Sequence, residues 1–192
     1  MNNQDIIAFF DRWASDWDAD MVRDDAKIGF ILDAAHVVPG VRVLDVACGT
    51  GVLFPDYLKR GVASVTGIDI APEMVKIAAA KFPEVTVLCG DVESTQFTKQ
   101  FDRIMVYNAF PHFPDPAKLV QTLAGLTKAG GRLSVAHGMS RAMLIKHHER
   151  ASTVSIDLIH EEELKEIFSQ WFDVDVVISN EQMYQVSGVR KG

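Results

Sequence analysis

Four polar residues end or follow short apolar, β-branched runs of the sequence: Asp45, Asp69, Asp91 and Asn108. If these runs are strands of one parallel sheet, their carboxyl ends meet at the edge where open α/β sheets bind ligands. Three carboxylates there are a poor lining for phosphate groups. They suit a ligand with hydroxyl groups, an amine and a positive centre. The pattern therefore predicts a small-molecule site at this edge and disfavours most phosphate-rich cofactors.

A glycine-rich turn follows the first of these runs, in the stretch VRVLDVACGTGVLF at residues 41–54. Gly49 and Gly51 fit the start of the G-x-G-x-x-G fingerprint of dinucleotide-binding proteins, but Phe54 stands at the third glycine position. A nucleotide pyrophosphate needs close backbone approach and tight helix packing at this turn. The substitution, together with Asp91, therefore disfavours a nicotinamide-dependent oxidoreductase.

The elements that position these residues follow from the spacing of the apolar side chains. Strands are expected at residues 41–46, 64–70, 84–90 and 101–109, and a fifth is expected before residue 138. Helices are expected at 51–60, 71–82 and 115–129, the last closed by Gly130 and Gly131. Repeated strand–helix–strand units of this length imply a parallel sheet that is covered on both faces.

The two ends of the chain add to this core. Helix-period apolar residues are expected to form N-terminal helices at 3–21 and 22–38, and a further helix is expected at 160–172. Two strands then reach residue 190, with residues 180–182 between them as the turn of an antiparallel hairpin. The predicted fold is a Rossmann-like, doubly wound α/β fold. Its seven-stranded sheet is mostly parallel, with an antiparallel C-terminal hairpin and N-terminal lid helices.

We expect a single domain over residues 1–192. It comprises a helical cap (1–38), a cofactor-binding core (41–138), and an acceptor-side segment with the C-terminal hairpin (139–192). A chain of 192 residues is long enough for one sizeable core.

No run approaches the ~18 apolar residues of a membrane span, and the acidic N-terminus lacks an apolar leader segment, so a cytoplasmic location is expected. The net charge of −7 disfavours nucleic acid as a partner. Cys48 and Cys89 offer no disulfide framework or C-x-x-C pair.

Several stretches resemble the class I S-adenosylmethionine-dependent methyltransferases in order and spacing, over about residues 41–138: VLDVACGTG, GIDI, CGDVE and FDRIMVYNAFPHFPD. FFDRWASDWD and NAFPHFPDPAKLV are similar to the small-molecule branch that includes the ubiquinone and menaquinone C-methyltransferases. The resemblance implies S-adenosylmethionine as cofactor, S-adenosylhomocysteine as product and no metal. One departure is Ala47, which stands where the family pattern often has glycine.

The resemblance also implies roles for individual residues. Asp69 would accept both ribose hydroxyls, and Asp91 with the Val92 amide would contact the adenine. The helix after the turn would offer its N-terminal amides to the carboxylate of the cofactor. Trp17 is a possible cover of the cofactor, although aromatic residues at helical spacing are more often part of a core. The cofactor-binding residues expected in this way are Asp45, Ala47, Gly49, Thr50, Gly51, Asp69, Ile70, Met74, Gly90, Asp91, Val92, Asn108 and Trp17.

The expected reaction is an in-line displacement in which an acceptor atom attacks the methyl group. Asn108 would lie beside the path of the methyl group, and His112 would act as a base because imidazole titrates near neutrality. An equally open interpretation is that His112 only bonds its own loop. A D/N-P-P-Y sequence is absent, which argues against DNA or RNA bases as acceptor and favours a small molecule. The alternative from another class is a regulatory protein that binds the cofactor without transferring its methyl group.

Residues 137–160 gather basic side chains in an otherwise acidic chain: Arg141, Lys146, Arg150, His137, His147, His148 and His160. They suggest either a cationic patch for an anionic or quinone-like acceptor or a metal site built from the four histidines. The histidine spacing matches no zinc or iron signature well. A solvated basic helix face is therefore the favoured interpretation.

Overall fold

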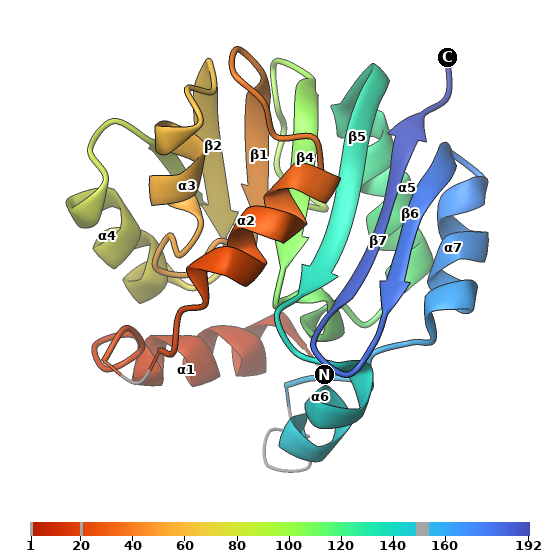
Figure 1. Cartoon of the computed structure of the whole chain (residues 1–192). Helices are drawn as coiled ribbons and strands as arrows, with labels where there is room; N and C mark the ends of the chain where they lie inside the picture. The colour runs from red at the N-terminus through yellow and green to blue at the C-terminus, as the bar shows by residue number, and fades with distance from the viewer. Residues whose placement is uncertain (1, 20, 149–153) are drawn as a thin grey trace.

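The centre of the molecule is one seven-stranded sheet in the order β3-β2-β1-β4-β5-β7-β6 (Figure 1). It is seen in a computed structural model that describes residues 2–19, 21–148 and 154–192. Strands β1 to β5 run parallel, and β7 is antiparallel to both β5 and β6. The strands are β1 (Arg42–Val46), β2 (Ser64–Asp69), β3 (Thr86–Cys89), β4 (Phe101–Tyr107), β5 (Thr127–His137), β6 (Phe172–Ser179) and β7 (Tyr184–Arg190). The predicted mostly parallel sheet with an antiparallel C-terminal hairpin is confirmed.

Helices cover both faces of the sheet, because successive side chains of a strand point to opposite faces. Val43 packs with the helices of one face and Leu44 with those of the other. The first face carries α2 (Asp25–Ala34), α3 (Phe54–Lys59) and α4 (Pro72–Lys81), and the second carries α5 (Pro116–Leu126) and α7 (Glu161–Ser169). Figure 1 shows α1 (Asn3–Trp13) and α6 (Arg141–His148) beyond the carboxyl ends of the strands, and the 3-10 turn η1 (Phe110–His112) follows β4.

Several element boundaries differ from those expected. The helices predicted at 3–21, 22–38 and 160–172 are shorter, as the bounds of α1, α2 and α7 show. The helix predicted at 115–129 ends at Leu126, and β5 begins at Thr127, which pairs with Phe101 of β4. The Thr127 hydroxyl donates to the Leu123 carbonyl at 2.7 Å, which satisfies an orphan acceptor of the helix end. Gly130 has φ +72° inside the strand, so the glycines fit the irregular pairing of β4 with β5 and do not stop the helix.

The helix predicted from Gly51 begins three residues later, at Phe54. Its ring explains the missing third glycine of the fingerprint. A Cβ atom on Gly51 would lie 2.6 Å from the Phe54 ring, and one on Gly67 of β2 would also lie 2.6 Å from it. Phe54 is fully buried in the space that these two glycines leave open. The helix therefore packs on the sheet through an aromatic ring instead of through a glycine.

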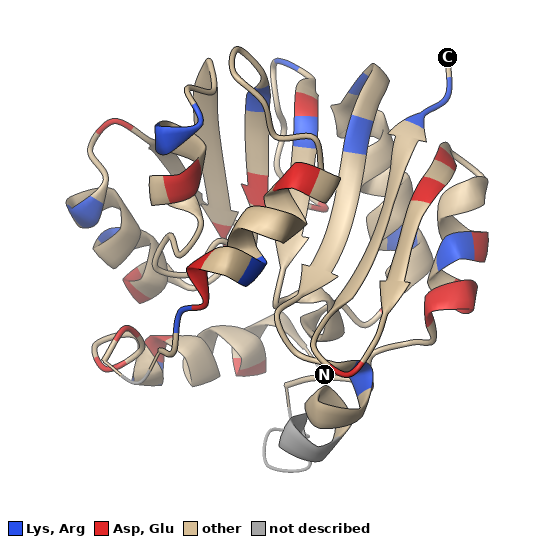
Figure 2. Cartoon of the chain, viewed as in Figure 1, with Lys and Arg blue, Asp and Glu red and all other residues tan. Residues whose placement is uncertain are grey.

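None of the helices in the described part of the chain has the length and hydropathy that crossing a bilayer requires. Figure 2 shows Lys and Arg interspersed with Asp and Glu along the elements.

Candidate active site

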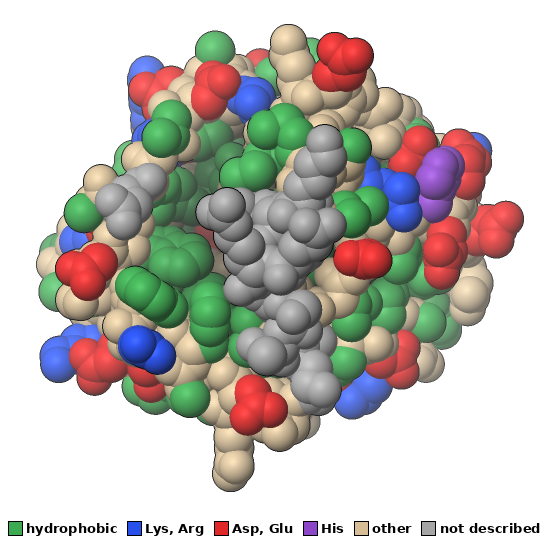
Figure 3. Space-filling model, turned by 90° about the horizontal axis from the view of Figure 1, so that it is seen from below, with side chains coloured by type: hydrophobic (Ala, Val, Ile, Leu, Met, Phe, Trp, Pro, Cys, Tyr) green, Lys and Arg blue, Asp and Glu red, His purple; other side chains and the backbone are tan. Residues whose placement is uncertain are grey.

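A cavity of about 860 Å³ opens at the carboxyl ends of the parallel strands. This volume lies near the upper end of the range for small-molecule sites, about 300–1,000 Å³. Figure 3 looks onto this side of the molecule and shows hydrophobic side chains around a hollow. The expected site residues that line it are Ala47, Gly49, Thr50, Asp69, Ile70, Met74, Gly90, Asp91, Val92, Asn108, His112 and Trp17. Asp45 and Gly51 are not among its lining residues.

Asp69 ends β2 and holds the glycine turn beside it. Its Oδ2 accepts a hydrogen bond from the Gly49 amide at 2.8 Å, and its Oδ1 accepts one from the Ala71 amide at 2.9 Å. Burial raises the pKa of Asp69, and these backbone amides oppose the shift. Each carboxylate oxygen can accept more than one hydrogen bond. Asp69 is thus held in one orientation at the cavity wall with capacity for a ligand that donates hydroxyls.

Asp91 follows β3 and is also held from two sides. Its Oδ1 accepts from the Glu93 amide at 2.9 Å, and its Oδ2 accepts from the Asn3 side chain at 3.1 Å. The first bond is a local turn contact, and the second brings the N-terminal helix α1 to the end of β3. The local role and a ligand role are therefore compatible at this position.

The glycine turn places two left-handed residues at the cavity. Ala47 has φ +53° and Gly49 has φ +54°, a conformation that glycine adopts at little cost and alanine does not. A Cβ atom on Gly49 would meet nothing within 4 Å, so it would extend into open space at the cavity wall. Gly49 thus keeps space for a ligand that approaches the backbone closely.

Gly51 has a packing role in the turn, and its expected contact with a cofactor stays a prediction. Its φ is +85°, and the space beside it is filled by the rings of Phe54 and Phe82. It permits the packing of α3, and its lack of a side chain does not widen the cavity.

Asp45, at the end of β1, is only 2% exposed. Burial raises its pKa to about 8, the Tyr57 hydroxyl opposes the shift, and the Asp69 carboxylate adds to it. Asp45 thus lies buried near Tyr57 and Asp69, and its expected contact with the cofactor stays a prediction.

An aromatic series joins the N-terminal helix to the segment after β4. Phe10 makes edge-to-face contacts with Trp17 at 5.5 Å and with His112 at 5.0 Å between ring centroids. All three side chains line the cavity. The His112 Nδ1 donates to the Val154 carbonyl at 2.8 Å, because a carbonyl oxygen can only accept. In the neutral ring the basic lone pair is therefore on Nε2, which is the nitrogen that a general base would use.

Asn108 closes β4 in a left-handed conformation, with φ +53°. Its Oδ1 accepts from the Gly138 amide at 2.9 Å, which ties the end of β4 to the end of β5. Tyr107 and Met139 line the cavity beside this contact and were missed from the sequence. A Cβ atom on Gly138 would lie 2.8 Å from the Tyr107 hydroxyl, so this glycine makes room for the tyrosine. The position of Tyr107 next to Asn108 was a signal that sequence reasoning left unused.

The N-terminal segment is fastened over the glycine turn by Asp18. One of its carboxylate oxygens accepts from the Thr50 hydroxyl at 2.6 Å, and the other pairs with Lys81 at 2.6 Å. We call the contacts of Asp18 with Thr50 and Lys81 the Asp18 latch. In the same segment, the Asp11 carboxylate caps α4 by accepting a hydrogen bond from the Glu73 amide at 2.9 Å. The segment contributes much of the cavity wall, and its lining residues not expected from the sequence include Ile6, Phe9, Trp13, Met21, Val22 and Arg23.

The described basic residues of segment 137–160 lie in different elements. His137 is buried in β5, and His160 caps α7, so these two histidines belong to different elements. Arg141 donates to the Leu158 carbonyl at 2.7 Å and does not line the cavity. The side chains of Lys146, His147, His148 and Arg150 lie outside the described residues. Among the described residues, no group of three or more His, Cys, Asp or Glu could hold a metal ion.

Comparison with known proteins agrees with this geometry. The family model described as "Methyltransferase domain" matches residues 44–135. The chain is 30% identical over 140 residues to a demethylmenaquinone methyltransferase of Renibacterium salmoninarum, covering 69% of this chain and 58% of that protein. It is 35% identical over 142 residues to a ubiquinone biosynthesis O-methyltransferase of Xanthomonas campestris pv. campestris, covering 67% of this chain and 56% of that protein. The chain thus spans little more than half the length of these relatives.

A solved structure shows the same fold at low sequence identity. The N-methyltransferase NodS of Bradyrhizobium japonicum, in complex with S-adenosyl-L-homocysteine, superposes with a TM-score of 0.78 at 13% identity. The match covers 97% of this chain and 98% of that one. At this identity it supports the fold alone. The family match identifies residues 44–135 as a methyltransferase domain, the kind of domain that the resemblance implied.

Proposed function

We propose that this chain binds S-adenosylmethionine in the cavity and transfers its methyl group to a small-molecule acceptor. The observation that carries the proposal is the joint placement of Asp69, Asp91 and Gly49 at one cavity wall. Asp69 is oriented by two backbone amides, and the wall beside Gly49 is open. Two carboxylates on a lining whose described acids outnumber its described bases suit a ligand that has hydroxyls and positive charge but no phosphate.

The residues present fit the cofactor. Asp69 would accept the ribose hydroxyls, Asp91 would accept from the adenine amino group, and Met74 and Ile70 would flank the base. The turn residues Gly49 and Thr50 would lie along the methionine part. When bound, S-adenosylmethionine supplies a methyl group that its sulfonium centre already activates. The protein then contributes alignment, for which effective molarities of order 10⁵ to 10⁸ M are known in well-oriented systems.

Asn108 and His112 lie on the side of the cavity where an acceptor would enter. His112 can receive a proton on Nε2 while Nδ1 remains bonded to the Val154 carbonyl. An acceptor that loses a proton on methylation would need such a base. The relatives named as quinone-pathway methyltransferases support a small organic acceptor, and the aromatic lining supports one with a flat apolar body.

The test has a binding step and a transfer step. Calorimetry should show that S-adenosylhomocysteine binds and that NADH does not. Incubation with methyl-labelled cofactor and a metabolite extract should then label a small molecule. His112→Ala should bind S-adenosylhomocysteine but transfer the methyl group more slowly, and transfer at the parental rate would remove His112 from the mechanism. Tight cofactor binding with no labelled product would favour a regulatory cofactor-binding protein.

A further inference from the structure

Arg23 lines the cavity together with Tyr107 and Asn108, on the side where an acceptor would enter. A guanidinium at a cavity wall is ordinarily a recognition group for carboxylate or phosphate. Whether Arg23 can act in this way depends on what its nitrogen atoms already contact.

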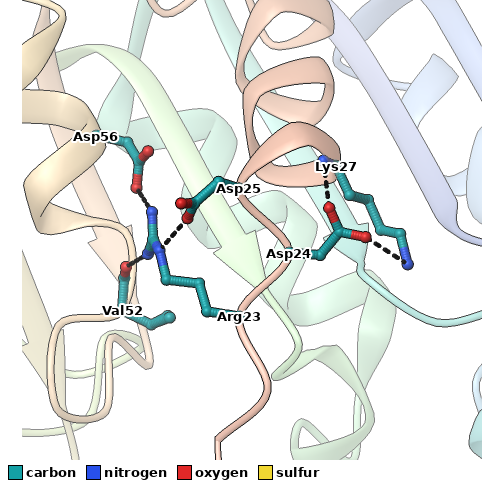
Figure 4. A network of polar contacts seen from close by, with 6 residues as sticks. All are labelled: Arg23, Asp24, Asp25, Lys27, Val52 and Asp56. Carbon is teal, nitrogen blue, oxygen red and sulfur yellow. Dashed lines mark hydrogen bonds and ion pairs between the residues drawn. The ribbon is translucent and has the colours of Figure 1, made fainter.

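Each nitrogen of the Arg23 guanidinium is engaged within the protein (Figure 4). Nε pairs with Asp25 at 2.6 Å, one terminal nitrogen donates to the Val52 carbonyl, and the other pairs with Asp56. The Arg23 side chain is 29% exposed and that of Asp56 is 19% exposed, so the pair is partly shielded from water. One positive charge therefore faces two negative charges, and each guanidinium nitrogen already has an acceptor within the protein.

The neighbouring cations are also paired. Lys27 lies 3.6 Å from Asp24 (Figure 4). It also donates to the Gly138 carbonyl at 2.9 Å. Lys118 pairs with Glu93 at 2.7 Å. Among the described residues that line the cavity, Arg23 and Lys118 supply the Lys and Arg charges, against the acids Asp16, Asp24, Asp69, Asp91 and Glu93. The described part of the lining therefore carries a net negative charge, whereas the cationic alternative for segment 137–160 concerns side chains that lie mostly outside the described residues.

We propose that Arg23 is a specificity-determining residue whose charge is neutralised by Asp25 and Asp56, so that the acceptor side admits uncharged aromatic molecules and rejects those carrying a carboxylate or phosphate. The aromatic side chains of the wall supply the attraction for a flat apolar body. An anionic group would meet a surface of net negative charge in a site with reduced solvent screening. The inference rests on the proposed function and deepens it by naming the acceptor class.

The experiment compares two probes that differ by one carboxylate: 2-naphthol and 6-hydroxy-2-naphthoic acid. Each is titrated by calorimetry into the protein saturated with S-adenosylhomocysteine. The wild-type protein should bind the neutral probe at least about fivefold more tightly, a ratio that corresponds to about 1 kcal/mol, because one unfavourable charge contact in a partly shielded site costs at least that much. Asp25→Asn and Asp56→Asn each leave Arg23 one carboxylate short, and each should reduce this preference by about threefold.

Asp33→Asn is the matched control. It makes the same change of formal charge in the ion pair of Asp33 with Arg60, whose 2.6 Å contact lies outside the cavity lining. It should leave the preference unchanged. Asp25 is 81% exposed, so its replacement tests the charge even where Asp56→Asn perturbs folding.

The outcomes separate this inference from the proposed function. Absence of S-adenosylhomocysteine binding would overturn the proposed function itself. Binding of S-adenosylhomocysteine with equal affinity for the two probes, with preference for the acid, or with affinity for neither would overturn the acceptor class alone. A further outcome is that the ratio of the affinities for the two probes changes no more in Asp25→Asn and Asp56→Asn than in Asp33→Asn. In that case Arg23 is not the cause of the preference.

Discussion

At the scale of single residues, the two glycines of the turn do different things although the motif presents them alike. Gly49 borders open space at the cavity, whereas Gly51 accommodates the ring of Phe54. Both have positive φ, so both are strained by any Cβ atom. What distinguishes them is the neighbour that the Cβ atom would meet, and the sequence carries no information on that neighbour.

This difference predicts separable effects of alanine at the two positions. Gly51→Ala should lower the free energy of unfolding by about 2 kcal/mol or more, since backbone strain adds to overpacking against Phe54. Gly49→Ala should cost only the strain, about 1–2 kcal/mol, but should weaken S-adenosylhomocysteine binding. Urea unfolding and calorimetry measure the two effects.

The control for these glycines is Gly125, which lies in helix α5 with nothing within 4 Å of a built Cβ atom. Gly125→Ala should raise the free energy of unfolding by about 0.5–1 kcal/mol, because alanine favours a helix. If Gly51→Ala were as stable as the parent protein, the packing role assigned to Gly51 would be wrong.

At the scale of elements, most strands and helices could be predicted because their apolar periodicity is strong and their ends carry turn residues. The boundary between α5 and β5 could not, since Gly130 and Gly131 resemble a helix stop. The strand pairing of Thr127 with Phe101 decides that boundary, and this is a contact between residues far apart in the sequence. The departure at Ala47 was visible, but its left-handed φ of +53° was not.

The contacts of the N-terminal helix with the glycine turn predict how firmly it is held. Asp18→Ala removes both contacts of the Asp18 latch, with Thr50 and with Lys81. The hydrogen bond is worth about 1 kcal/mol, and the ion pair adds little because both side chains are more than a third exposed. Hydrogen exchange measured by mass spectrometry should therefore become about fivefold faster over residues 3–17.

Asp16→Ala is the control for the Asp18 latch. The side chain of Asp16 belongs to the same segment and makes no hydrogen bond or ion pair with the rest of the described chain. Exchange in this variant should match the parent protein. Equal exchange in Asp18→Ala as well would mean that the aromatic contacts of Phe10, and not Asp18, hold the segment.

At the scale of the whole molecule, the part of the cavity proposed to hold the cofactor could be predicted from the sequence, and the part proposed to receive the acceptor could not. The cofactor side is built from consecutive strand ends, whose meeting at one edge follows from the topology. The acceptor side combines Arg23, Tyr107 and Met139, which come from three separate segments. Their meeting depends on long-range contacts such as Asn108 with Gly138, so of the three only Tyr107, next to Asn108, carried a signal in the sequence.

The sheet as a whole depends on how the C-terminal hairpin is joined to the parallel core. Arg132 of β5 reaches across β7 and pairs with both carboxylate oxygens of Asp175 of β6, each at 2.6 Å. The Arg132 side chain is only 3% exposed, and Asp175 lies at the irregularity between Val174 and Val176 where the pairing register shifts. The buried Arg132 guanidinium is thus neutralised by a residue that has no partner in the regular pairing of β6 with β7.

Asp175→Asn should therefore lower the free energy of unfolding by about 1–3 kcal/mol, because it leaves the Arg132 charge poorly compensated. This loss is smaller than that expected for a fully buried ion pair, because the Asp175 side chain is half-exposed. The control is Asp173→Asn, at an exposed neighbouring position on β6, which should change the free energy of unfolding by less than about 0.5 kcal/mol.

Pairing with Arg132 lowers the folded-state pKa of Asp175 from its ordinary value of 3.8. The pair therefore stabilises the fold above that value, and the contribution is lost as the pH falls through the lowered pKa. Urea unfolding measures the free energy of unfolding of the parent protein and of Asp175→Asn at pH 7 and at pH 3, and the difference between them should be smaller at pH 3. If the difference does not depend on pH, the carboxylate charge is not what joins the hairpin to the core.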